Sequence, residues 1–374
     1  MGPLHGIRIL EMAGIGPCPL AGQLLADMGA SVTVVDRASG ADHSNDVNRR
    51  NKRSIAVDAK SAGGRDLVLR LIEASDVLIE GFRPGVMERL GLGPQIALER
   101  NPGLIYGRMT GWGQEGPLSA SAGHDLTYMA ITGALNAMGA ADRPPRPPLN
   151  LVADYGGGSM MLVTGVLAAL VERAGSGKGQ VIDTAMVDGV PALTGIFRTM
   201  MAQGQWVNRR DDNLLDGYCP FYRCYTASDG RHVAVGALEP QFFAVLVEKT
   251  GLDPQWRKRQ MDKAGWPELT LTLEAIFAQK SRDDWAVVFE GGDGCVAPVL
   301  DWDEAPEHPH NRARRNHIEV DGVMQAAPAP RFSRTPTGTP NAGVMAGASS
   351  EAVLAEAGLD GEAIERLRAA GVLT

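Results

Sequence analysis

The chain has 374 residues, of which 44% are hydrophobic and 21% are charged. This length predicts two or three domains, and the composition is ordinary for a globular protein. The formal net charge is −8. Proteins that bind nucleic acids more often carry a basic surplus, so the charge argues against a nucleic-acid partner. A local basic patch is still compatible with a small phosphorylated ligand.

Cysteine usage and the chain ends suggest a cytoplasmic protein. The four cysteines form no C-x-x-C pair, which argues against a zinc knuckle or a redox dithiol and favours a reducing compartment. The first residues lack a secretory pattern, and the last residues carry no S-K-L peroxisomal address. The longest apolar stretch, Met160 to Val171, is too short to cross a bilayer. We therefore expect no membrane partner.

The N-terminal part alternates short apolar runs with amphipathic stretches. A β-rich run followed by a helical pattern is typical of βαβ units, so the alternation predicts a parallel sheet covered by helices on both faces. We expect strands at 7–12, 31–35, 54–57, 76–80 and 104–108, and helices at 19–29 and 66–74.

The pattern changes after residue 110. A glycine-rich loop at 111–123 precedes an expected helix at 124–137, and a proline-rich extended connection at 140–148 precedes another at 159–173. Two apolar runs, 222–226 and 232–237, flank Ser228-Asp229-Gly230 and predict a β-hairpin. We expect a strand at 181–186 and further helices at 241–250, 267–279, 282–290 and 350–370. The predicted domains are a large one at 1–190 to which 325–374 returns, a linker helix at 191–218, and a small α+β domain at 219–324.

The turn after the first expected strand reads Gly14-Ile15-Gly16-Pro17-Cys18-Pro19. It matches half of the dinucleotide-binding fingerprint, but Pro19 occupies the third glycine position. At the end of the next strand, Asp36 fits a ribose hydroxyl of a nicotinamide cofactor, whereas Arg37 fits a phosphate group. An ordinary βαβ turn without a ligand is the third interpretation. We favour a phosphorylated ligand on Arg37.

A basic run follows this turn in an otherwise acidic chain. Such runs are usually solvated faces, but this one leads directly into a short strand, where a polyphosphate head group would also explain it. The sequence leaves both interpretations open. The run consists of Arg49, Arg50, Lys52 and Arg53, followed by Lys60.

Three side chains at element ends are candidates for chemistry. His124 opens an expected helix, where a lone histidine is more often a cap or a packing residue. Asp154 precedes three glycines at 156–158; aspartate is a good helix cap, but the glycines also let a ligand approach the backbone closely. Glu239 ends an expected strand, and its alternative role is a solvated strand end. Functional residues gather at such positions, so the three together predict a site.

Other reactive patterns receive less support. The chain contains neither a G-x-S-x-G nucleophile elbow nor a G-x-x-x-x-G-K-[ST] phosphate loop. The stretch His308-Pro309-His310 lies near Asp301 and Asp303 but is interrupted by proline and is typical of a surface loop. We therefore expect no metal site.

Five short runs share one resemblance. They are Met109–Gln114, Ala122–Asp125, Pro148–Asp154, Gly177–Val181 and Gly236–Phe242. Together they resemble the α-methylacyl-CoA racemases, a group of isomerases within CoA-transferase family III. The similarity extends from Gly6 to about Phe332, and the histidine at position 124 is the discriminating residue.

The resemblance implies a fold and an assembly. The fold would be α/β, with a Rossmann-like large domain built on a parallel sheet and a smaller α+β domain. Two subunits would interlock as a homodimer, and the active site would form between the large domain of one subunit and the small domain of the other. Glu239 would then come from the partner. The resemblance implies no cofactor beyond the CoA of the substrate.

The resemblance also implies roles in racemisation of 2-methylacyl-CoA thioesters. His124 and Asp154 would exchange the α-proton on opposite faces, and Glu239 would orient His124. Inversion through a planar enolate requires two such groups, one of them carrying a proton. Backbone N–H groups at the start of the His124 helix suit the developing oxyanion. A nearby carboxylate favours the imidazolium form of His124 and a helix N-terminus disfavours it, which leaves its resting state open.

For CoA binding, the resemblance implies a set of residues spread over four segments. Two departures concern Cys18, in place of a small residue, and Tyr218-Cys219, which would narrow the acyl pocket and leaves the preferred acyl group open. The implied binding residues are Arg37, Val57, Asp58, Ala59, Lys60, Arg83, Arg89, Gly123, Asp125, Leu126, Thr127 and Tyr128.

Three other functions are compatible with the residues. A family III CoA-transferase would use Asp154 as a covalent nucleophile on the thioester. A protein that only binds CoA or a nucleotide would use the same pocket without turnover. A nicotinamide-dependent dehydrogenase is the weakest alternative. The sequence decides neither the acyl group nor the direction of flux.

Overall fold

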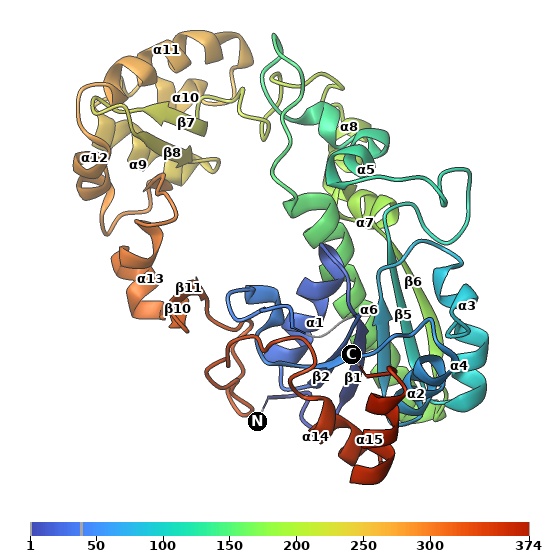
Figure 1. Ribbon diagram of the computed structural model, residues 1–374. Helices are drawn as coiled ribbons and strands as arrows, with labels where there is room; N and C mark the ends of the chain where they lie inside the picture. Colours follow the sequence, from blue (N-terminus) through green and yellow to red (C-terminus); the bar gives the residue numbers. More distant parts are fainter. Residues whose placement is uncertain (1, 38–39, 374) are drawn as a thin grey trace. The chain divides into compact units, whose positions relative to one another are not determined.

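The computed structural model describes residues 2–37 and 40–373, and the chain divides into two compact units (Figure 1). The large unit comprises Met1–Thr132, Pro148–Leu193 and His310–Thr374, and the small unit comprises Gly133–Pro147 and Thr194–Pro309. The predicted domains at 1–190 with 325–374, 191–218 and 219–324 stay a prediction. The compact units differ from them, because Gly133–Pro147 belongs to the small unit and the chain returns to the large unit at His310.

The large unit is built on a parallel sheet, of which β1, β2, β5 and β6 are labelled in Figure 1. The sheet has six strands in the order β3-β2-β1-β4-β5-β6. The expected α/β fold is confirmed. The order reverses between β1 and β4, so the loops that follow these two neighbouring strands diverge and leave a crevice at their carboxyl ends. The strands are β1 (Arg8–Met12), β2 (Ser31–Asp36), β3 (Lys52–Ala56), β4 (Val77–Glu80), β5 (Ile105–Thr110) and β6 (Gln180–Ala185).

Helices cover both faces of this sheet. One layer contains α1 (Pro17–Asp27) and α6 (Met160–Ser176), which contact each other and the strands. On the other face, α2 (Ala62–Glu73) and α4 (Pro94–Arg100) share one apolar core with the C-terminal helices α14 (Ser350–Glu356) and α15 (Gly361–Ala369). Burial of this core, which removes apolar surface from water, is the main stabilising contribution to the large unit.

The remaining elements complete the backbone description. The expected helix at 124–137 is interrupted, because Gly133 adopts a φ of 85° and ends the first segment. These elements are α3 (Val86–Arg89), α5 (Asp125–Thr132), a π-helix (Leu151–Ser159), α7 (Met186–Leu193), α8 (Gly195–Ala202), α13 (Pro309–Arg314), β10 (His317–Val320) and β11 (Val323–Ala326), with 3₁₀ turns at Val47–Arg49, Leu135–Ala137, Lys263–Gly265 and Ala305–Glu307.

Among the described residues, one continuous helical stretch, Leu151–Ser176, has the length and composition of a membrane span. It joins the π-helix to α6 and is longer than the apolar stretch noted in the sequence. Its α6 part packs against β5 and β6, as a helix that covers a sheet does. A single stretch of this kind is weak support for a membrane location.

The small unit has an α+β core around a β-hairpin. Strands β7 (Tyr222–Thr226) and β8 (His232–Gly236) pair antiparallel, as the sequence predicts, and β9 (Val296–Pro298) extends the sheet. The core beneath is rich in aromatic rings, such as the stacked pair of Tyr225 and Phe277, whose centroids lie 5.0 Å apart. The helices are α9 (Pro240–Thr250), α10 (Trp256–Arg259), α11 (Trp266–Phe277) and α12 (Arg282–Phe289).

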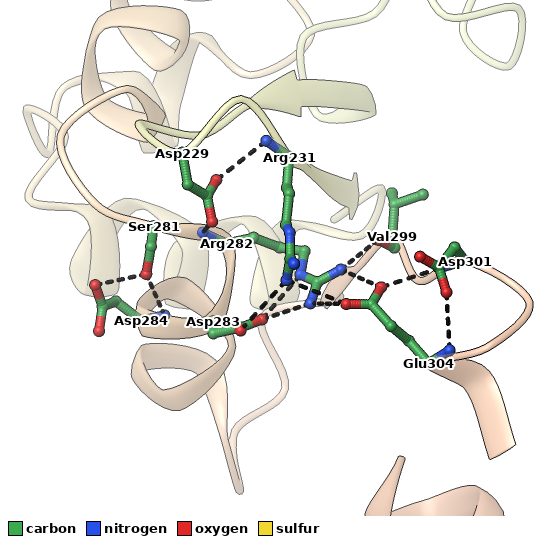
Figure 2. A network of polar contacts seen from close by, with 9 residues as sticks. All are labelled: Asp229, Arg231, Ser281, Arg282, Asp283, Asp284, Val299, Asp301 and Glu304. Atoms are coloured by element: carbon green, nitrogen blue, oxygen red, sulfur yellow. Dashed lines mark hydrogen bonds and ion pairs between the residues drawn. The ribbon is translucent and has the colours of Figure 1, made fainter. Parts of the chain in front are cut away.

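A polar network fastens the hairpin turn to α12 and the loop after β9 (Figure 2). The Asp229 carboxylate accepts hydrogen bonds from the backbone N–H groups of Arg231 and Arg282. The Arg282 guanidinium then contacts Asp283 and donates to Glu304 over 2.6 Å. The hydrogen bond from Arg282 lowers the pKa of Glu304 to about 2. The network therefore stays ionised throughout the neutral range and fixes the loop that follows β9.

The basic run at 49–53 lies inside the large unit, where acids of the same chain neutralise it. Arg49, Arg50 and Lys52 are each less than 10% exposed. They are therefore neither a solvated face nor a site for a polyphosphate head group, and both interpretations are wrong for these three residues. The pairs are Arg49–Asp36, Arg50–Asp27, Lys52–Glu11 and, nearer the surface, Arg53–Glu356.

We expect Lys52→Met to destabilise the large unit by about 3–5 kcal/mol at pH 8, because it leaves the buried Glu11 carboxylate without its counter-ion. Burial already raises the pKa of Glu11, and Lys52 opposes this shift. The loss should therefore shrink at pH 5, where Glu11 can take up a proton. Urea unfolding at the two pH values measures it. Lys178→Met, at an exposed position, is the matched control and should stay within about 0.5 kcal/mol of wild type.

Candidate functional site

A cavity of about 370 Å³ lies in the large unit at the carboxyl ends of the parallel strands. Its walls include Ile15–Cys18 after β1, Gly81–Pro84 after β4 and Thr110–Trp112 after β5. The first two loops leave the sheet on either side of the point where the strand order reverses. This is where open α/β sheets generally bind ligands.

His124 lines this cavity directly before α5. Its backbone carbonyl accepts hydrogen bonds from the N–H groups of Thr127 and Tyr128, at 2.8 and 3.2 Å, which begins the helix as expected. The Thr127 hydroxyl donates to the same carbonyl and accepts from the His124 N–H. The backbone of His124 is thereby fixed, while its imidazole stays exposed.

Asp154 lines the same cavity from the π-helix. Its interpretation as a helix cap is wrong, because it lies inside the element and Asn150 occupies the N-cap position. Burial raises the pKa of Asp154; a hydrogen bond from Asn150 opposes the shift, the charge of Asp125 adds to it, and that of His124 opposes it. Asp154 and His124 are thus close enough to interact electrostatically.

The glycine-rich loop is shaped around Tyr128. A Cβ atom at Gly111 would come within 2.0 Å of the Tyr128 ring, and one at Gly123 within 2.4 Å. The ring also meets Trp112 edge to face at 4.8 Å. Burial and the charge of Asp154 raise the pKa of Tyr128, and Arg83 opposes them. Glycine at these two positions lets the loop close over the aromatic pair that forms one wall of the cavity.

The cavity gathers only part of the predicted CoA-binding set. Arg83, Gly123 and Tyr128 line it together with the two candidate bases. Arg37 lies outside, with its guanidinium 5.8 Å from the centre of the Phe82 ring, which does line the cavity. Asp125 is buried behind the wall. The binding role of these residues stays a prediction.

The other members of the set do not line the cavity. Val57 is 1% exposed and forms a backbone bridge with Leu373, so its side chain belongs to the core. Asp58 and Ala59 are partly exposed, and Lys60 is exposed. Arg89, Leu126 and Thr127 are also exposed but do not line the cavity.

Glu239 belongs to the small unit, where it occupies the N-cap position of α9 and is exposed. Tyr218 and Cys219 are in the same unit; the Tyr218 ring lies 5.9 Å from that of Trp266, and Cys219 is buried. Cys18 is buried at the cavity, and burial raises the pKa of its thiol. The Cys18 thiol is therefore held in its neutral form, which is not nucleophilic.

Asp36, on which the nicotinamide interpretation depends, is not available to a ligand. Arg49 forms an ion pair with Asp36, and the Ser54 hydroxyl donates to Asp36 over 2.5 Å, so the carboxylate is buried and engaged within the fold. Within the described ranges, no group of three or more histidine, cysteine, aspartate or glutamate side chains is arranged to hold a metal ion. The cavity is left as the candidate site.

Sequence reasoning missed several residues of the cavity wall. Phe82, Trp112 and Met186 all line it, and they follow or adjoin the carboxyl ends of β4, β5 and β6. Their position at or shortly after the ends of expected strands was the available signal. Apolar residues there are equally typical of the core, so the sequence did not distinguish the two roles.

Glu80, the last residue of β4, is hydrogen-bonded to the loop that lines the cavity. Its carboxylate accepts from the Phe82 N–H over 2.7 Å and from Arg108 over 3.0 Å. Burial raises the pKa of Glu80 to about 7, although both hydrogen bonds oppose the shift. Glu80 therefore titrates in the neutral range beneath the loop that carries Phe82 and Arg83.

We expect Glu80 to make the stability of the large unit depend on pH. Its pKa is about 7 in the folded chain against an ordinary 4.5, so its contribution is fully present below pH 4.5 and is lost as the pH rises through 7, by roughly 3 kcal/mol in total. Urea midpoints between pH 5 and 8 should fall in wild type relative to Glu80→Gln. Glu73→Gln, at a more exposed ion pair, should follow wild type. Parallel curves for wild type and Glu80→Gln would contradict this prediction.

Comparisons with known proteins agree on one family. Residues 4–345 match the model of CoA-transferase family III. The chain is 45% identical over 335 residues to alpha-methylacyl-CoA racemase of Mus musculus and 41% identical over 336 residues to that of Homo sapiens; each match covers 89% of this chain and 87% of the relative. The crystal structure of a CaiB/BaiF family protein from Brucella suis has a TM-score of 0.80 at 28% identity, covering 95% of this chain and 99% of that one. The chain therefore belongs to CoA-transferase family III.

Proposed function

We propose that this enzyme racemises 2-methylacyl-CoA thioesters by moving the α-proton from one face of the substrate to the other. One observation carries the proposal: an imidazole, His124, and a carboxyl group, Asp154, line the same cavity of about 370 Å³. The identity of 45% and 41% to two racemases over most of the chain supports the same reaction.

The reaction balances without a co-reactant. One base removes the proton from C2, the C–H bond breaks, and its electron pair moves into the thioester carbonyl to form an enolate. The other group then donates its proton to the opposite face of C2. The two groups exchange protonation states, so the reverse reaction resets them. Each positioned acid or base typically contributes about a hundred- to ten-thousand-fold to the rate.

The environment of Asp154 suits this task. Burial raises the pKa of its carboxyl group above the ordinary value, so the group binds a proton more readily than an ordinary carboxylate does. The enolate oxygen requires hydrogen-bond donors, and the first backbone N–H groups of α5 are the ones we assign to it. The Thr127 hydroxyl helps to hold that first turn in place.

The proposal includes CoA binding by residues outside the cavity. Arg37, Lys60, Arg83 and Arg89 are exposed cations in the large unit, suited to the phosphates of CoA. Val57, Asp58 and Ala59 would contribute to the adenine segment, and Gly123 to Tyr128 would flank the thioester. We propose that the enzyme uses no cofactor beyond this CoA. We also propose that it is located in the cytoplasm.

We also propose that the enzyme is an interlocked homodimer in which Glu239 orients His124 of the other subunit. A carboxylate in that position would favour the protonated imidazole. Glu239 is exposed on the small unit and so is free of a buried structural role there. The assembly makes each active site a shared structure, which gives a direct test by mixing variants.

Incubation with one enantiomer of a 2-methylacyl-CoA in deuterated water tests the reaction itself. We expect loss of optical purity together with incorporation of one deuterium at C2, and no requirement for an acceptor acid. NMR and mass spectrometry of the thioester measure both. Strict dependence on an acceptor carboxylic acid, with no exchange, would instead favour a CoA-transferase that uses Asp154 as its nucleophile.

Two variants separate catalysis from binding. His124→Ala and Asp154→Ala should each lower the exchange rate by at least about a hundredfold while the Kd for CoA changes little. His43→Ala, at a partly exposed position outside the cavity, is the matched histidine control. Unchanged CoA affinity in a chain whose wild type shows no turnover at all would indicate a binding protein instead.

Mixing two inactive variants tests the shared site. If each site combines His124 of one subunit with Glu239 of the other, refolding a 1:1 mixture of His124→Ala and Glu239→Ala should restore about a quarter of wild-type activity, because half the dimers are mixed and each has one intact site. If both residues came from one subunit, every site would carry one defect and no activity would return. Each variant refolded alone is the control.

A further inference from the structure

Asp125 links the two segments that carry the candidate bases. It is the first residue of α5, directly after His124, and is only 5% exposed. One oxygen of its carboxylate, Oδ2, accepts hydrogen bonds from the backbone N–H groups of Ala153 and Asp154, both at 2.8 Å. The two elements are separated by almost thirty residues in sequence, yet they are joined at these two amides.

These hydrogen bonds satisfy donors that the π-helix does not satisfy itself. The first N–H groups of any helix lack partners within it and need an external acceptor. Asn150, at the N-cap position, makes no side-chain cap to this backbone. The acceptor comes from α5 instead, so the beginning of the π-helix is positioned by the helix that directly follows His124.

The second carboxylate oxygen of Asp125, Oδ1, is buried and accepts no hydrogen bond within the described part of the chain. A buried acceptor without a partner is unfavourable, so the fold tolerates a cost at this point. Neutral asparagine would supply one oxygen for the same two N–H groups. The two hydrogen bonds alone therefore do not require a negative charge at position 125.

We propose that Asp125 is a positioning residue whose carboxylate fixes the separation of His124 and Asp154 during proton transfer and places a negative charge beside Asp154. The fixed separation concerns geometry within the large unit. The effect of the charge on proton transfer rests on the proposed function. Oδ2 supplies the geometric link, and the carboxylate charge acts on the neighbouring acid.

Several groups act on Asp154 and define the expected pH behaviour. Asp125 raises the pKa of Asp154, and His124 and Asn150 oppose it. Tyr128, on α5, also interacts with Asp154, and Arg83 acts on Tyr128. The other elements that contact the π-helix are α1, α6, α7 and β6, and their titratable side chains are Cys18 and Asp27 on α1, Glu172 and Arg173 on α6, Asp188 on α7 and Asp183 on β6. Removing the Asp125 charge should therefore shift the titration of Asp154 towards acid.

Two substitutions at position 125 separate the link from the charge. Asp125→Asn keeps the size and one acceptor oxygen, so the amides of Ala153 and Asp154 should keep their protection from hydrogen exchange. The acidic limb of the kcat/KM profile should move to lower pH, because the Asp125 charge no longer raises the pKa of Asp154. Asp125→Ala removes both functions; the two amides should lose protection and kcat should fall about a hundredfold, with KM within about twofold of wild type.

Asp360→Ala is the matched control. Asp360 also caps a helix of the large unit, accepting from the Ala363 N–H over 2.8 Å, but it does not line the cavity. The control should keep wild-type kcat and the wild-type pH profile. If Asp125→Ala does not fold, Asp125→Asn still carries the test through its pH profile.

Two results would overturn the proposal. One is an Asp125→Ala enzyme with kcat within twofold of wild type. The other is a parallel loss of kcat, CoA affinity and Tm in both variants with an unshifted pH profile, which would indicate a general structural role. Absence of deuterium incorporation in wild type would refute the proposed function alone, because protection of the amides at 153 and 154 reports the link without any turnover.

Discussion

The candidate site depends on one interaction, the acceptance of two backbone N–H groups of the π-helix by the carboxylate of Asp125. Without an external acceptor, these amides would be buried donors lacking partners, which folded proteins avoid. This interaction fixes the backbone of Asp154 directly, because one of the two N–H groups belongs to Asp154. The position of the acid in the cavity is therefore set by the segment that also presents His124.

The buried basic residues of the large unit form ion pairs with acidic residues of the same unit. Arg49, Arg50 and Lys52 neutralise acids on β1, β2 and α1 within the buried layer. Other cations of the large unit, such as Lys60 and Arg89, are exposed. A buried charge requires a partner, so the proximity of basic residues in sequence is no guide to the face on which they lie.

The sequence predicted what depends on local periodicity and failed where tertiary contacts decide. Alternating apolar runs predicted the parallel sheet and the hairpin, because these patterns reflect burial of a strand face. His124 and Asp154 were candidates because of their positions at element ends, and the resemblance in five runs implied their roles. The π-helix around Asp154 was not predicted, since its capping acceptor is distant in sequence. The ion pairs of the basic run were missed for the same reason: each acid lies on another element.

The pairing of an imidazole with a carboxyl group distinguishes the proposed chemistry from acyl transfer. A nucleophilic carboxylate needs only itself and access to the thioester carbon, whereas a 1,1-proton transfer needs a second group that alternates with it. Burial and the neighbouring charge of Asp125 both favour the protonated form of Asp154. His124 lines the same cavity and supplies the second group. Covalent attack by Asp154 has no need of that group, whereas proton exchange across a shared carbon does.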